Sequence, residues 1–248
     1  MANSSSQLNR VEPAKAPVAS APPPPVPTRP RMSSVGSDLV VISQPQGARA
    51  EAFRTLRTHI LVQHVRLGRR ALSVCAPNSG VGCSFVAANL AAGLAQVGLK
   101  TLLIDADLRH PSLDRFFPAP RAEPGLAQAL TSHELSFGDC IQHEVIPHLS
   151  LMYAGSASER AHELLASERF TALVDFSLRE FEATIIDAPP ANQSSDASRI
   201  ASLAGYSLIV AGRDTTLVSD IKTLANELTS DFAQVVGTVL NEAKAKRK

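Results

Sequence analysis

The sequence lacks tryptophan, contains only two tyrosines and three cysteines, and carries a formal net charge of just +1 over 248 residues. A balanced charge gives no indication of nucleic-acid binding or of attraction to a membrane surface. Three cysteines without paired spacing fit a reducing compartment and indicate neither a disulfide framework nor a zinc site. No run reaches the about 20 apolar residues of a membrane span, and the N-terminus has no apolar signal core. We therefore expect a soluble cytoplasmic protein without a membrane span of its own or a nucleic-acid partner.

The chain divides by composition into three parts. Residues 1–37 are rich in proline, alanine and serine, a composition that cannot bury a core and predicts a disordered tail. Residues 38–243 alternate between strand-like and helix-like segments, and residues 244–248 form a short basic tail. An amphipathic helix is predicted at 48–65, and strands are predicted at 71–76, 100–105, 148–153, 183–187, 206–211 and 234–240. This alternation predicts one α/β domain, a mostly parallel central sheet with helices on both faces.

A glycine-containing loop follows the first of these strands. Residues 76–84 read Ala-Pro-Asn-Ser-Gly-Val-Gly-Cys-Ser and precede an alanine-rich helix. Gly80 and Gly82 let the backbone approach an anion, and the helix N-terminus directs free N–H groups and the positive end of its dipole toward it. In the full pattern G-x-x-x-x-G-K-[ST], the lysine contacts phosphates and the hydroxyl residue binds Mg²⁺. Here Ser84 keeps the hydroxyl, but Cys83 replaces the lysine and Pro77 the first glycine.

The cysteine weakens the loop as a phosphate site. The Cys83 thiol is neutral at its ordinary pKa, and a helix N-terminus favours its thiolate, which repels phosphate. By itself the loop also fits a tight strand-to-helix turn that binds nothing.

Two other predicted strands end in carboxylates. Asp105 ends the strand at 100–105 and is followed by Asp107, while Asp187 ends the strand at 183–187 and is followed by Ala-Pro-Pro. An acid at a strand end is commonly a turn former. However, the carboxyl ends of parallel strands meet at one edge of a sheet, where such folds bind ligands. We therefore expect these acids to converge with Ser84 on a hard-cation site next to the loop.

Together these motifs resemble those of the bacterial tyrosine kinases, or capsule and exopolysaccharide ATPases, of the deviant-Walker group that includes cell-division and partition ATPases. Residues 102–109 are similar to the family's second acidic motif, D-x-D-x-R after a hydrophobic run. Residues 185–190 are similar to its Walker B segment with a D-x-P-P ending. Residues 51–57 are similar to its E-x-x-R-x-x-R helix, and the resemblance extends over residues 48–242. It implies a P-loop NTPase-like fold.

The resemblance implies a role for each matching residue. Asp105 and Asp107 would be catalytic, assisting the metal and the acceptor hydroxyl, and Ser84 and Asp187 would hold Mg²⁺. ATP or ADP would contact Asn241 at the adenine and the loop residues Gly80, Val81, Gly82, Cys83 and Ser84.

The resemblance also implies partners. Glu51, Arg54 and Arg57 lie at spacings of three, which places them on one helix face. In the family this helix is associated with ring-like self-association, so a homo-oligomer is expected, although a solvated network within one chain is the alternative. A second implied partner is a membrane-embedded polysaccharide co-polymerase, or chain-length regulator, which would hold the protein at the inner membrane.

The chain departs from the family in two places. Cys83 replaces the lysine, and Phe85 replaces a small hydroxyl residue. The loop therefore contains neither Lys nor Arg. The family's tyrosine-rich C-terminal cluster is absent, and Tyr153 and Tyr206 both fall in predicted strands. These losses favour a regulatory pseudokinase of polysaccharide biosynthesis and export. The alternatives are an active tyrosine kinase or ATPase using ATP and Mg²⁺, and a partition-type positioning ATPase, against which the E-x-x-R-x-x-R helix argues.

Overall fold

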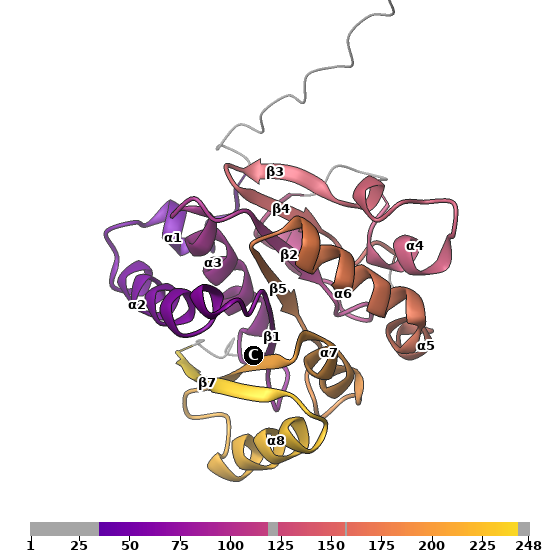
Figure 1. The fold of residues 1–248 in the computed structure, drawn as a ribbon. Helices are drawn as coiled ribbons and strands as arrows, with labels where there is room; N and C mark the ends of the chain where they lie inside the picture. Colours follow the sequence, from indigo (N-terminus) through magenta and orange to yellow (C-terminus); the bar gives the residue numbers. More distant parts are fainter. Residues whose placement is uncertain (1–34, 119–123, 157, 243–248) are drawn as a thin grey trace, which may run out of the picture.

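The computed structural model describes residues 35–118, 124–156 and 158–242 (Figure 1). The predicted tails at 1–37 and 244–248 lie outside these residues, apart from 35–37. The strands are β1 (Ala71–Cys75), β2 (Thr101–Asp105), β3 (Gln142–Ile146), β4 (Leu149–Met152), β5 (Ala183–Asp187), β6 (Tyr206–Gly212) and β7 (Gln234–Asn241). The α-helices are α1 (Val40–Ser43), α2 (Ala48–Gln63), α3 (Cys83–Ala95), α4 (Leu126–Thr131), α5 (Ala161–Ala166), α6 (Glu168–Glu180), α7 (Asp196–Ala204) and α8 (Val218–Ser230). Short 3₁₀ helices are η2 (Val65–Leu67), η3 (Leu113–Arg115) and η4 (Gly138–Cys140).

The strands form one seven-stranded sheet in the order β3-β4-β2-β5-β1-β6-β7. All neighbouring pairs are parallel except β3 with β4, which is antiparallel. The predicted mostly parallel α/β sheet is therefore confirmed, and each predicted strand is present within one or two residues of its expected ends. Strand β3 was not predicted, because an edge strand with exposed polar positions lacks the continuous apolar run of a buried strand.

Helices cover both faces of the sheet (Figure 1). Successive side chains of a strand point to opposite faces, so Leu72 and Val74 of β1 pack with α1, α2 and α3, while Ala71 and Cys75 pack with the layer of α4 to α8. Both faces of the central strands are thereby buried, which explains their nearly continuous apolar sequences. In the part of the chain that the structure describes, no helix has both the length and the apolar character needed to cross a membrane.

The strand order determines where the functional residues meet. Strands β2, β5 and β1 are neighbours, and their carboxyl ends lie at the same edge of the sheet. Asp105 is directly in register with Asp187 across the β2–β5 pair. The loop between β1 and α3 starts at this edge, so the structure brings these residues to one place, and their binding of a cation stays a prediction.

Candidate functional site

The loop between β1 and α3 has the backbone geometry of an anion-binding turn. Gly80 and Gly82 adopt φ values of 77° and 87°, in the left-handed region that a side chain makes costly. Gly82 is the residue that precedes α3, and no side chain caps this helix. The first N–H groups of α3 are therefore left for a ligand, and the helix dipole favours a negative one.

The loop is fixed to the strands and segments around it. The N–H groups of Ala191 and Asn192, in the segment after β5, donate to the carbonyl oxygens of Ala76 and Pro77 at 2.9 and 3.1 Å. On the other side, the Asn241 side chain donates to the carbonyl oxygen of Val81 at 2.8 Å. These contacts hold the turn open before any ligand arrives, which lowers the entropy cost of binding.

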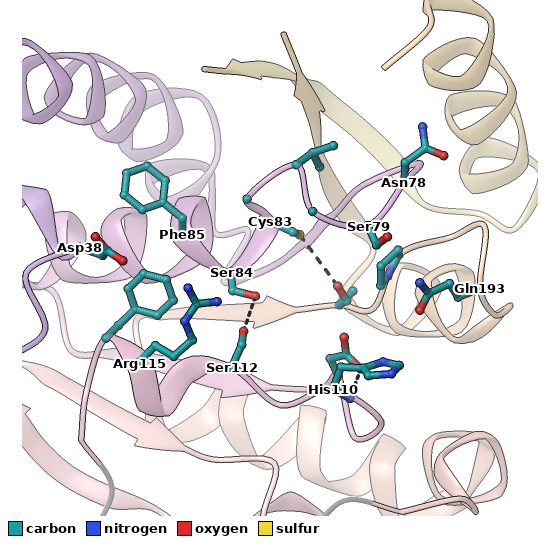
Figure 2. Close-up of a pocket in the computed structure, with 17 residues that line it drawn as sticks. Asp38, Asn78, Ser79, Cys83, Ser84, Phe85, His110, Ser112, Arg115 and Gln193 are labelled. Carbon is teal, nitrogen blue, oxygen red and sulfur yellow. Dashed lines mark hydrogen bonds and ion pairs between the residues drawn. The ribbon is translucent and has the colours of Figure 1, made fainter. Parts of the chain in front are cut away.

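Cys83 points away from the position that a phosphate would take. Its thiol donates to the carbonyl oxygen of Val74 at 3.2 Å, beneath the loop, and it also approaches that of Ala188 (Figure 2). Burial, and next the charge of Asp187, raise the pKa of the Cys83 thiol well above its ordinary value. The expectation that the helix N-terminus favours a thiolate is therefore wrong, because desolvation outweighs the dipole. The site has a neutral thiol where the pattern has a cation.

Asp187 is a buried carboxylate that lacks hydrogen bonds. Its side chain is almost fully enclosed, and neither oxygen has a hydrogen-bond partner in the described residues. Burial, and next the charge of Asp105, raise the pKa of Asp187 well above the usual range. Ser84 and Cys83 lie near enough to oppose this rise in pKa, but neither meets the geometry of a hydrogen bond to Asp187. An unpartnered carboxylate beside a serine hydroxyl suits a small divalent cation.

The donor set fits Mg²⁺ better than a metal enclosed by protein alone. Within the described residues, no cluster of three or more His, Cys, Asp or Glu side chains could hold a metal ion. Mg²⁺ is commonly bound by one or two protein groups together with water and substrate phosphates. Ser84 and Asp187 supply two such groups next to the anion-binding turn, so the metal site implied by the resemblance is compatible with this structure.

Asp105 shapes the loop that follows β2. Its oxygens accept hydrogen bonds from the backbone N–H groups of Asp107, Ser112 and Leu113, at 3.1 to 3.2 Å. Burial raises the pKa of Asp105 to about 7, against the opposing effect of these hydrogen bonds. Asp105 is therefore committed to backbone contacts, whereas Asp107 lines the cavity in front of the loop.

The cavity beside the loop has a volume of about 690 Å³. One wall is the β1–α3 turn, and the others are formed by the segments after β2 and β5 and by Asp38 near the start of the domain (Figure 2). Ser112 contributes to the wall opposite the turn and donates a hydrogen bond from its hydroxyl to Ser84 Oγ at 2.8 Å. The sequence did not predict three of the lining residues, Ser112, His110 and Arg115. No local sequence pattern indicates that a loop residue turns back toward a site.

Asn241 is brought near the loop but lies outside this cavity. It holds the Val81 carbonyl, and it lines a separate groove of about 330 Å³ between α2, the start of α3 and the end of β7. An adenine contact by Asn241 remains a prediction. The structure assigns it a supporting contact with the loop.

Glu51, Arg54 and Arg57 of α2 are not among the residues that line the cavity. Arg54 pairs with Glu51 at 2.5 Å and also donates to the carbonyl oxygen of Pro45, so part of the network lies within one chain. Arg57 lies against Gly93 of α3. Self-association through these residues stays a prediction.

A further charged cluster lies at the N-terminus of α7. Asp196 is buried and accepts hydrogen bonds from Arg109, in the segment after β2, and from His162 of α5 at 2.8 Å. Burial alone would raise the pKa of Asp196, but these hydrogen bonds offset it and hold the pKa below the ordinary value. Asp196 thus links three segments, one of which carries the arginine of the D-x-D-x-R motif.

A positive-φ glycine turn, an uncapped helix N-terminus and a buried carboxylate at the end of the neighbouring strand together define a phosphate-binding-loop protein. Comparison with known proteins identifies the family to which the chain belongs. The chain belongs to the CobQ/CobB/MinD/ParA nucleotide-binding domain family, whose model matches residues 72–248.

Within that family its relatives are bacterial tyrosine kinases. The chain is 29% identical to Staphylococcus aureus CapB, provisionally named a tyrosine-protein kinase, over 86% of this chain and 92% of CapB. It is 28% identical to the tyrosine-protein kinase Wzc of Salmonella typhi over 83% of this chain, but it spans only 28% of Wzc. The kinase domain of the Escherichia coli tyrosine kinase ETK matches with a TM-score of 0.77 and 25% identity, covering 89% of this chain and 88% of that domain.

Proposed function

We propose that this protein is a regulatory pseudokinase of capsule or exopolysaccharide biosynthesis, which binds a nucleotide with Mg²⁺ weakly and turns it over negligibly. The observation that carries the proposal is the orientation and neutrality of Cys83. Its thiol is hydrogen-bonded beneath the loop, so the loop offers phosphates backbone donors and Ser84 but no side-chain cation. Removal of such a cation typically costs a factor of about 100 to 1,000 or more in rate.

The remaining parts of the site suit binding. The loop backbone and the N-terminus of α3 would cradle the phosphates, and Ser84 with Asp187 would hold Mg²⁺. When bound, Mg²⁺ would neutralise phosphate charge. Asp107 faces the same cavity and would orient an acceptor or water, while Asp105 keeps the intervening backbone in place.

The absence of a presented tyrosine also supports a pseudokinase. The chain has two tyrosines, and both are engaged by the fold. Tyr153 directly follows β4, and its hydroxyl donates to the carbonyl oxygen of Phe117 at 2.7 Å. Tyr206, the first residue of β6, packs against His64 and lies under the Arg69 guanidinium. Neither side chain is free to reach the cavity of a second molecule.

Nucleotide titration and turnover measurements test this proposal. The full-length protein should bind Mg-ADP weakly, hydrolyse ATP at background rate and show no tyrosine phosphorylation. Cys83→Lys should increase affinity, more for ATP than for ADP, because the added ammonium reaches the terminal phosphates. Cys83→Ser is the matched control, since it changes the side chain without adding charge, and it should leave affinity unchanged. Robust ATP turnover or tyrosine phosphorylation by the unmodified protein, lost in Asp105→Ala, would overturn the proposal and establish an active kinase.

We further propose that the protein acts in the cytoplasm by docking onto a membrane-embedded chain-length regulator at the inner membrane. The support is the relationship to tyrosine kinases such as Wzc, of which this chain matches only one part. Specific docking depends on surface complementarity and survives the loss of catalysis. In cells, deletion followed by restoration with Asp105→Ala and Asp187→Ala together tests this. Restored polysaccharide output supports a regulatory role without catalysis, whereas a deletion without effect contradicts it.

A further inference from the structure

The cavity beside the loop contains one guanidinium group that the loop itself does not supply. Of the described residues that line the cavity, Arg115 is the only Lys or Arg. Figure 2 shows its side chain extending from the segment after β2 toward Ser84, on the side of the cavity opposite Asn78 and Gln193. The position is ten residues beyond Asp105 in the sequence, so no motif around the loop indicates it.

The fold fixes the backbone of this arginine from two sides. Arg115 ends η3, whose first residue, Leu113, is fully buried and donates its N–H to Asp105 at 3.2 Å. The next residue, Phe116, is buried against Phe85 of α3, and its carbonyl oxygen accepts a hydrogen bond from Gly36 at 2.8 Å. The backbone of Arg115 is therefore already ordered, so only its side chain loses conformational freedom when it binds a ligand.

The charge of Arg115 is not used by the rest of the described structure. Arg54, Arg109 and Arg213 each form ion pairs with acidic residues, whereas Arg115 forms none with any described residue. Asp38 and Asp107 line the same cavity, yet neither comes within ion-pair distance of it. The cation therefore lines the same cavity as Ser84 and the uncapped end of α3, without a partner of opposite charge in the described residues.

A second observation shows that the same place is built for a ligand. Asp187 is buried near Ser84, and its carboxylate has no hydrogen-bond partner in the described residues. A bound cation would stabilise this carboxylate. Ser84 and Asp187 would hold Mg²⁺, which would supply the positive charge that Asp187 lacks, and the Arg115 guanidinium would bind phosphate oxygens. Guanidinium groups bind two phosphate oxygens side by side and stay charged at any physiological pH.

We propose that Arg115 is the phosphate-binding cation of this site, replacing from the β2–α4 segment the lysine that the loop lacks. The inference rests on the proposed function in that its ligand is a nucleoside diphosphate or triphosphate. Arg115 enters from another wall of the cavity than the lysine of the full pattern. It therefore contributes to phosphate affinity without restoring the contact that Cys83 has lost.

Equilibrium titration of the full-length protein with Mg-ADP and with adenosine tests the role of Arg115. Arg115→Gln should weaken Mg-ADP binding by about tenfold or more, the typical worth of a hydrogen bond to a charged group, and leave adenosine binding unchanged. Arg115→Lys should retain part of the affinity. The matched control is Arg179→Gln, which removes an exposed arginine of α6 and should leave both ligands unaffected. Thermal melts of Arg115→Gln should match those of the parent, because the side chain is exposed.

The outcomes separate this inference from the proposed function. Unchanged Mg-ADP affinity in Arg115→Gln, or equal weakening of adenosine, overturns the role of Arg115. No nucleotide binding by the parent protein also overturns it, while the regulatory role tested in cells still stands. Conversely, ATP turnover by the parent together with weakened Mg-ADP binding by Arg115→Gln overturns the pseudokinase and supports Arg115.

Discussion

Replacement of Asp187 by asparagine should stabilise the ligand-free protein. The carboxylate is almost completely buried and its two oxygens have no hydrogen-bond partner in the described residues. An asparagine amide would be buried without partners as well, so the gain comes from removing the charge, and a one-unit rise in the pKa of a buried carboxyl corresponds to about 1.4 kcal/mol. Asp187→Asn keeps the shape, removes the charge and ends the repulsion with Asp105. We therefore expect the free energy of unfolding at pH 8 to rise by about 1–3 kcal/mol, which corresponds to about 2–4 °C in Tm for each kcal/mol in a domain of this size.

The pH dependence of this effect follows from the direction of the pKa shift. Burial raises the pKa of Asp187, so the folded state binds this proton more tightly than the unfolded state does. Stability therefore falls as pH rises from the ordinary carboxyl range through the folded-state pKa. The gain from Asp187→Asn should be largest at pH 8 and small near pH 5, where the parent side chain is already neutral in the folded protein.

Chemical denaturation at the two pH values, with and without Mg-ADP, measures these effects. The asparagine variant should gain stability without ligand and lose the extra stabilisation by Mg-ADP, which is about 2.7 kcal/mol when the ligand is present at 100 times its Kd. Asp196→Asn is the contrasting control, because this equally buried carboxylate has partners and its replacement should destabilise. A loss of stability in Asp187→Asn at pH 8, or a gain that is equal at both pH values, would refute the reasoning.

Two further predictions concern the charged residues of the helices and loops. Arg109→Leu should lower the free energy of unfolding by about 1–2 kcal/mol. The loss is smaller than for a fully buried ion pair, because Arg109 is partly exposed and Asp196 keeps its hydrogen bond with His162. Urea denaturation measures this change, and an unchanged midpoint would contradict it. Since the pKa of Asp196 is lowered, its contribution is complete above the ordinary carboxyl pKa and lost as pH falls through the folded-state value. Arg54→Glu with Arg57→Glu should dissociate a homo-oligomer in light scattering, and an unchanged mass would leave only the pair with Glu51 within the chain.

Much of the fold follows from local patterns in the sequence. The buried strands are continuous apolar runs bounded by polar residues, so β1, β2 and β5 could be located to within a residue. Parallel strands bring their carboxyl ends together, so the strand assignments predicted that Asp105 and Asp187 lie at one edge of the sheet. That β2 and β5 are neighbours, with the two residues in register, came from the structure. Strand β3 could not be found in this way, because an exposed edge strand has no such run.

The chemistry of the site was decided by contacts between distant segments. The neutral state of Cys83 depends on its enclosure between the loop, β1 and the segment after β5, none of which a motif describes. The position of Arg115 in the cavity that Ser84 also lines depends on how the chain folds back after β2.

By itself, the sequence determined that the chain forms a parallel α/β sheet with a lysine-free phosphate loop, because strand periodicity and glycine placement act over a few residues. Only the tertiary structure decided which groups are desolvated and which charges face the cavity. Burial and electrostatic interaction depend on distances through space, and these join residues far apart along the chain, such as Cys83 with Asp187 and Arg109 with Asp196.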